Sequence, residues 1–148
     1  MKFHFWFTFL SLFYIALVAI GVAWLQTVGK LPAWIPLSDF LLMTLATMRL
    51  VRLFTYDNIT AFVRAWFLGA PEDTFLGALG VLINCPWCTG LWFAFVVVFA
   101  YFATPYAWYV ILILALSALA SSLQVLMNLI GWSAEAKKKE AESVMLPR

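Results

Sequence analysis

Residues 3–26 read FHFWFTFLSLFYIALVAIGVAWLQ. This run has no Asp, Glu, Lys or Arg, and a helix needs about 20 apolar residues to cross a hydrocarbon core of about 30 Å. The apolar stretch of a secretory signal peptide is shorter, usually about 7 to 15 residues. We therefore predict a membrane-spanning helix over about residues 4–26 rather than a cleavable leader.

The whole sequence predicts an all-α integral membrane protein with four transmembrane helices. Of its 148 residues, 66% are hydrophobic and 11% are charged, whereas soluble domains are roughly half apolar and about a quarter charged. Further spans are predicted at about residues 37–54, 89–104 and 106–130. The segment 37–54 is the weakest, because only nine uncharged residues, about 13 Å of helix, separate Asp39 from Arg49. An interfacial or partly re-entrant helix is the alternative there.

The stretch between the second and third spans is less hydrophobic and is interrupted by glycines and a proline. Residues 59–68 and about 75–83 are predicted to form two short amphipathic helices in the headgroup layer. The four spans make one helical domain over residues 1–132. Residues 133–148 are predicted to be a charged, partly disordered cytoplasmic tail.

The distribution of Lys and Arg predicts the orientation. With four spans, both termini and the loop between spans two and three lie on one side, and eight of the nine cations lie there. Those eight are Lys2, Arg49, Arg52, Arg64, Lys137, Lys138, Lys139 and Arg148. Only Lys30 lies on the other side. The positive-inside rule then places both termini in the cytoplasm and the protein in a bacterial inner membrane.

Cys85 and Cys88 are the two cysteines of the chain, in the sequence CPWC before the third span. Pro86 suits the first helical position, so Cys85 is expected to cap the helix, where the partial positive charge favours a thiolate. Three interpretations remain open. The pair is a redox dithiol, or half of a zinc site completed by His4 or a second copy, or two reduced residues that serve packing alone.

Arginines and an aspartate form a second cluster. Arg49, Arg52 and Tyr56 share one helix face by their spacing, and Asp57 and Arg64 follow them. One interpretation is a site for a phospholipid or phosphate group, with Asp57 orienting a guanidinium. The other is that the arginines are ordinary interfacial anchors.

The fourth predicted span carries a polar stripe, formed by Ser117, Ser121, Gln124 and Asn128 at helical spacing. Amides are unfavourable in hydrocarbon without partners, so the stripe predicts packing against another helix, within the chain or in a homo-oligomer. Spans three and four contain no Asp, Glu, His or Lys, which argues against a proton or ion path.

Several motifs together resemble a known family. They are TMRLVRL at 47–53, YDNIT at 56–60, Arg64, and CPWCTGLW at 85–92. In this order they resemble the small bacterial and phage membrane proteins of domain of unknown function 1360, over about residues 39–130. The resemblance implies a membrane location and allows a phage origin, but it implies no activity or catalytic residue.

The sequence contains no complete catalytic constellation, so we predict that the protein is not an enzyme. It has no basic groove interleaved with exposed aromatics, which argues against nucleic acid as a partner. We predict an oligomerising or partner-docking membrane subunit, in contact with the bilayer and its anionic lipids. The alternatives are a holin-like or other membrane-perturbing phage factor, and a thiol or metal site at Cys85 and Cys88. No cofactor is expected unless zinc binds there.

Overall fold

The computed structural model describes residues 2–71 and 74–145. These residues form six α-helices and one 3₁₀ turn, with no strand among them. The elements are α1 (Lys2–Thr27), α2 (Leu37–Thr55), η1 (Asn58–Thr60), α3 (Ala61–Leu68), α4 (Phe75–Asn84), α5 (Pro86–Ala103) and α6 (Ala107–Met145). The all-helical prediction is confirmed, and the two short helices expected before the CPWC sequence are present as α3 and α4.

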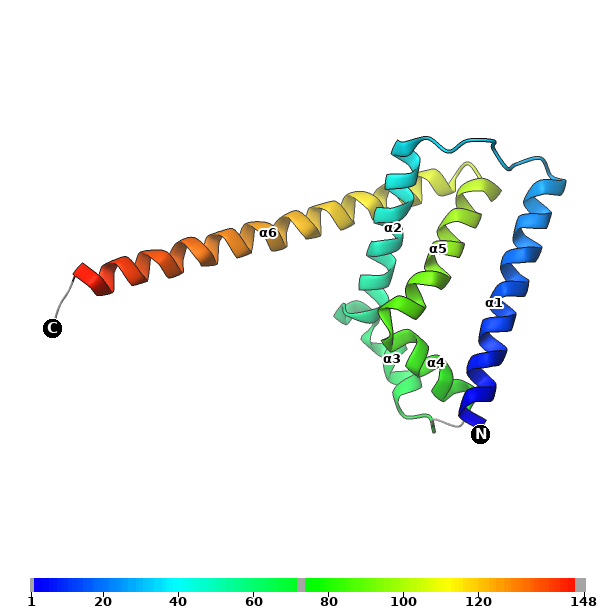
Figure 1. Cartoon of the computed structure of the whole chain (residues 1–148), viewed down its shortest axis with the longest axis horizontal. Coiled ribbons are helices and arrows are strands. Elements are labelled where there is room, and N and C mark those ends of the chain that lie inside the picture. The colour runs from blue at the N-terminus through cyan, green and yellow to red at the C-terminus, as the bar shows by residue number, and fades with distance from the viewer. Residues whose placement is uncertain (1, 72–73, 146–148) are drawn as a thin grey trace.

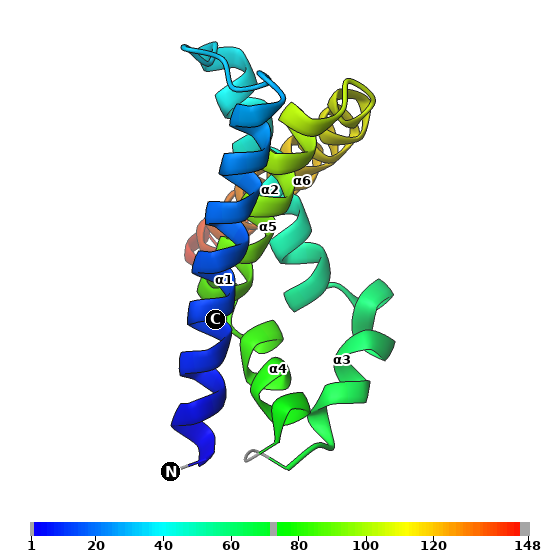
Figure 2. The same ribbon diagram turned by 90° about the vertical axis from the view of Figure 1, so that its right-hand side faces the viewer.

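The helices form a small bundle from which one long helix projects. In Figure 1, α5 lies between α1 and α2, and it contacts both. The short helices α3 and α4 pack against each other, and α4 reaches the N-terminal part of α1 (Figure 2). Helix α6 packs on α2 near the far end of α5 and then extends well beyond the bundle (Figure 1).

Small side chains let α6 approach α2 closely. Met43 and Ala46 of α2 meet Val97 of α5 and Ala107 and Ile111 of α6 in one buried cluster. Ala115 and Ala118 continue this contact along α6, and both are buried. Packing through small residues is typical of helices in membranes, where apolar burial gives no preference for protein over lipid.

The outer surface of the bundle is largely apolar. Large side chains of α1 and α6 are exposed, for example Ile20 at 69% and Ile113 at 67%. Soluble monomers rarely expose contiguous apolar patches larger than a few hundred Å². This surface therefore fits a lipid environment rather than water.

Among residues 2–71 and 74–145, three helical stretches, not four, are long and apolar enough to cross a membrane: Phe5–Thr27, Pro86–Ala103 and Ala107–Glu140. The segment predicted at residues 37–54 does form a helix, α2, of 19 residues. It falls short because Asp39, Arg49 and Arg52 interrupt it, as charges in a hydrocarbon core are strongly unfavourable. The prediction of four such spans is corrected on this point.

Helix α6 is also longer than expected. It continues through Met145 instead of ending near residue 130. Residues 133–145 contain no Gly or Pro and are rich in Ala, Glu and Lys, which favour helix, and Lys139 pairs with Glu135 at 3.3 Å. Arg148 lies outside the described residues, as do the side chains of Lys2 and His4.

Aromatic rings join α1 to α5. Tyr14 donates a hydrogen bond to the Leu91 carbonyl at 3.2 Å, and its ring meets that of Trp92 edge-on. Farther along, Gly21 faces Phe95, and a Cβ added at Gly21 would lie 3.0 Å from that ring. The absence of a side chain at Gly21 therefore lets the two helices pack closely.

At the end of the bundle that lies away from α3 and α4, polar contacts join the helices and the loop after α1. The Lys30 ammonium donates a hydrogen bond to the carbonyl of Ala103, the last residue of α5. Tyr101 of α5 donates to the Asp39 carboxylate on α2. A cation at a helix C-terminus is stabilised by the helix dipole, so Lys30, the lone cation expected on this side, has a structural role here.

Candidate functional site

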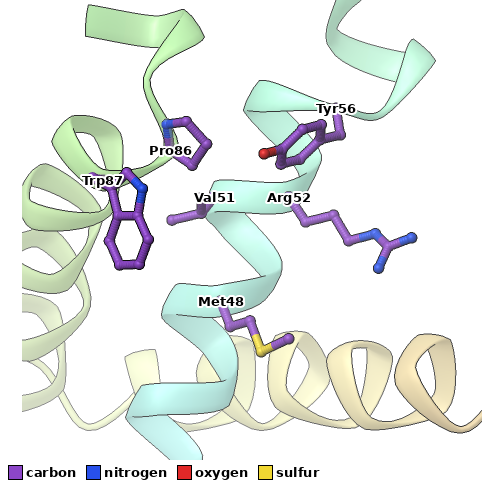
Figure 3. Close-up of a pocket in the computed structure, with 6 residues that line it drawn as sticks. All are labelled: Met48, Val51, Arg52, Tyr56, Pro86 and Trp87. Atoms are coloured by element: carbon purple, nitrogen blue, oxygen red, sulfur yellow. The ribbon is translucent and has the colours of Figure 1, made fainter.

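A groove opens where α2 ends and α5 begins. It has a volume of about 570 Å³ and is lined by Met48, Val51, Arg52, Tyr56, Pro86 and Trp87 (Figure 3). In the close-up, Trp87 and Pro86 come from α5, and Arg52 lies on α2. Val51 of α2 points toward Trp87, and Tyr56 directly follows that helix. Trp87 is 88% exposed, so its ring is accessible at the rim.

The two cysteines lie beside this groove at the junction of α4 and α5. Helix α4 ends at Asn84 and α5 begins at Pro86, so Cys85 caps both helices. The Cys85 Sγ accepts a hydrogen bond from the Cys88 backbone N–H at 3.3 Å. The Cys88 thiol donates to the same sulfur at 2.7 Å, and both cysteines are free thiols.

These contacts make the two sulfurs unequal. The hydrogen bond from the Cys88 thiol, followed by that from the Cys88 backbone N–H, lowers the pKa of Cys85 below its usual range. Both donors stabilise the Cys85 thiolate more than the neutral Cys85 thiol. The cap that the sequence predicted for Cys85 is therefore present in the structure.

Thr89 fixes the geometry of the junction. Its hydroxyl donates to the Leu82 carbonyl in the last turn of α4 at 2.7 Å, and the residue is buried. The side chain thus ties the end of one helix to the first turn of the next. The sequence analysis did not select Thr89, although its place directly after CPWC was the available signal.

Within the described part of the chain, the two cysteines are not joined by a third metal ligand. Among residues 2–71 and 74–145, no group of three or more His, Cys, Asp or Glu residues could hold a metal ion. A structural zinc ion usually takes four ligands. Cys85 and Cys88 would thus supply only half of such a site.

The structure separates the predicted arginine cluster into three roles. Arg49 forms an ion pair with Asp57 at 3.1 Å, between α2 and the loop that follows it. Arg64 donates from Nη1 to the carbonyls of Phe54 and Asp57, both at 2.9 Å, and to the Thr60 hydroxyl at 3.1 Å. Because Phe54 is in the last turn of α2, Arg64 serves as a cap for that helix.

Arg52 is the member of the cluster that lines the groove without a protein partner. Within the described part of the chain its guanidinium has neither a hydrogen bond nor an ion pair, and the residue is exposed. Met48 and Tyr56, four residues before and after it, share its helix face and line the groove. The spacing of Arg52 and Tyr56 predicted this face, but neither Met48 nor Trp87 was recognised as part of it.

The polar stripe of α6 divides into two pairs. Ser117 and Ser121 are half-buried, and Ser121 donates a hydrogen bond to the Ser117 carbonyl and faces α2 near Arg49. Gln124 and Asn128 lie beyond the bundle and are exposed, and Gln124 Nε2 donates to Asn128 Oδ1 at 3.1 Å. The outer pair has no hydrogen bond to another helix among the described residues.

The all-helical fold, its three stretches apolar enough to cross a membrane and its largely apolar surface fit a small membrane protein. A family model described as protein of unknown function, DUF1360, matches residues 70–127, which include CPWC and the first half of α6. The chain belongs to this family, and the resemblance seen in its motifs is confirmed. The arginine motifs at 47–64 lie before the matched residues.

Two proteins of Bacillus subtilis strain 168 are similar to the chain. The sporulation protein YjcA is 31% identical over 104 residues, a match that covers 88% of that protein and 59% of this chain. The UPF0713 protein YngL is 31% identical over 77 residues, which is 59% of that protein and 45% of this chain. The match therefore spans less than two thirds of YngL. No solved structure matches the chain.

Proposed function

We propose that this protein is a membrane subunit whose role is association rather than catalysis, and that it binds a second copy of itself through the outer part of α6. The observation that carries the proposal is the exposed end of α6. Its apolar residues from Leu123 to Trp132 project beyond the bundle, with Met127 65% exposed and Trp132 69% exposed (Figure 1).

Lipid can cover the apolar part of this surface, but it cannot satisfy the amides. The bond between Gln124 and Asn128 uses one donor and one acceptor, and each amide has further donors and acceptors. Leaving these groups unpaired in hydrocarbon is unfavourable. A second α6 brings the same two amides, and hydrogen bonds between membrane helices contribute about 0.6 to 2 kcal/mol.

The length of α6 suits this arrangement. Its membrane-compatible stretch, Ala107–Glu140, has 34 residues and would be about 51 Å long, against a hydrocarbon core of about 30 Å. Figure 1 shows α6 running across the direction of α1, α2 and α5, so in this proposal it crosses the bilayer strongly tilted and extends beyond the hydrocarbon core at its charged end. The charged turn around Glu135 and Lys139 then lies in water.

The proposal includes a crossing by α2, shielded by its neighbours. Helix α2 runs beside α5 and buries Met43 and Ala46 against α5 and α6 (Figure 1). Asp39 lies in its first turn and Arg52 in its last, and Arg49, about one turn farther in, is paired with Asp57. This path supports cytoplasmic N- and C-termini in a bacterial inner membrane by the positive-inside rule.

Anionic lipids are proposed as ligands of Arg52. Its guanidinium has no protein partner in the described residues, whereas Arg49 and Arg64 are engaged by protein groups. Trp87 and Tyr56 at the same groove are residue types enriched at membrane interfaces. The comparisons give no support to a holin-like role.

Native mass spectrometry of the full chain, released from nanodiscs, tests self-association. We expect dimers, and we expect the double substitution Gln124→Leu with Asn128→Leu to reduce the dimer fraction severalfold. Met127→Leu is the matched control on the same turn and should leave it unchanged. A monomer at every protein-to-lipid ratio, or equal dimer fractions in the variant and the control, would contradict the proposal. Since YjcA is named a sporulation protein, a sporulating Bacillus is a suitable host for the same comparison.

A further inference from the structure

Cys85 and Cys88 form a pair that self-association through α6 does not use. We propose that they are a reversible dithiol–disulfide pair, in which Cys85 is the attacking sulfur and Cys88 the resolving sulfur, and that the pair exchanges with disulfides presented from the aqueous side. This activity is separate from the proposed role of α6.

The two sulfurs are already positioned to react with each other. They lie 2.7 Å apart, whereas a disulfide bond is about 2.05 Å long. Cys88 is in the first turn of α5 and Cys85 is its cap, and the two sulfurs need to approach by only about 0.7 Å to form the bond. Thr89 holds the α4–α5 junction in place while this happens.

The direction of attack follows from the hydrogen bonds. The Cys85 sulfur accepts hydrogen bonds from both the Cys88 N–H and the Cys88 thiol, and it lies at the positive end of the α5 dipole. A thiolate is the reacting form of cysteine, and it is favoured where donors and a helix N-terminus converge. The lowered pKa of Cys85 agrees with this geometry.

An incoming group can reach the site. Cys85 lines a second groove of about 440 Å³, together with Gly77 and Gly80 of α4 and Phe67 of α3. Cys88 is exposed, and Trp87 between the two cysteines is 88% exposed. An extended peptide or a small molecule that carries a disulfide can therefore approach Cys85.

The reaction balances without a further reactant. The Cys85 thiolate attacks one sulfur of the incoming disulfide, forms a mixed disulfide and expels the other sulfur as a thiolate, which takes up the proton of Cys88. The Cys88 thiolate then attacks the Cys85 sulfur of the mixed disulfide and releases the second sulfur of the substrate as a thiolate. This thiolate takes a proton from water, which balances the proton that Cys85 gave to water when it ionised. Two electrons pass from the dithiol to the incoming disulfide, and a dithiol reverses the reaction.

Thiol trapping on the purified full chain in nanodiscs tests the inference. The protein is equilibrated in buffers of varying reduced and oxidised glutathione, quenched with acid and alkylated. We expect the chain to pass from two modified cysteines to none in one two-electron transition, with no glutathione retained. Accumulation of chains with two bound glutathiones and no internal disulfide would overturn the inference.

Two serine variants test the assignment of the sulfurs. Cys88→Ser should trap one glutathione per chain after reaction with oxidised glutathione, and Cys85→Ser should do so at least about tenfold more slowly. Equal rates in the two variants would refute Cys85 as the attacking sulfur. Stoichiometric zinc in the purified wild type, with both thiols protected from alkylation until chelation, would instead show a metal site. Helix content of each variant, measured by circular dichroism, verifies folding.

Discussion

Arg64 gives the sharpest test of how the structure uses its arginines. If it caps α2, Arg64→Gln removes a charged donor from the carbonyls of Phe54 and Asp57, both at 2.9 Å. Hydrogen bonds to charged groups contribute about 1.5 to 3 kcal/mol each, and the side chain is only partly buried, so water replaces part of this. We expect the free energy of unfolding to fall by about 2 kcal/mol, a factor of about 30 in the folded-to-unfolded ratio.

The assay is reversible unfolding in mixed micelles of increasing dodecyl sulfate content, followed by circular dichroism. Arg52→Gln is the matched control, because Arg52 lies in the last turn of α2, the helix that Arg64 caps, but its side chain has no protein partner in the described residues. It should change the free energy of unfolding by no more than about 0.5 kcal/mol. Equal losses in the two variants would refute the assignment of Arg64 as a cap.

Three further predictions concern the site and its supports. Gly80→Val should destabilise the α3–α4 pair by about 1 to 3 kcal/mol, because a Cβ at this position lies 3.0 Å from the Phe67 carbonyl oxygen; an unchanged unfolding transition would contradict this. Thr89→Val should lower the free energy of unfolding by about 1 kcal/mol and speed alkylation of Cys85, since it releases the bond to the Leu82 carbonyl; unchanged alkylation would show that Thr89 does not hold the junction. Arg52→Gln should reduce co-purification of anionic phospholipid, measured by lipid mass spectrometry, while zwitterionic lipid is unaffected, and equal retention of both would remove Arg52 from the lipid proposal.

Much of the fold could be predicted from local patterns. The apolar run at residues 3–26 predicted α1, and Pro86 predicted the start of α5 with Cys85 as its cap, because both signals depend on neighbouring residues alone. The end of α6 was misjudged. Charge was taken as a sign of disorder, whereas the Ala, Glu and Lys residues after Trp132 favour continuation of the helix.

The site was harder to predict because its contacts join separate elements. Helical spacing placed Arg49 and Arg52 on adjoining turns, but it could not show that the η1 turn brings Arg64 back onto the end of α2. Likewise, nothing in the local sequence placed Trp87 across a groove from Arg52, since this depends on how α5 packs against α2 (Figure 3). Periodicity shows which face of a helix a residue occupies, and tertiary packing decides what that face meets.

The central claim, that the outer part of α6 binds a second copy, is tested most directly by the distance between two such helices in lipid. A single spin label at Leu129→Cys, with Cys85 and Cys88 replaced by Ser, allows this measurement in nanodiscs by double electron–electron resonance, a pulsed electron paramagnetic resonance method. Packed helices lie about 8 to 10 Å apart, so we predict an intermolecular distance within about 25 Å, allowing for the label. Absence of any intermolecular coupling between labels in nanodiscs that contain two chains would contradict the account.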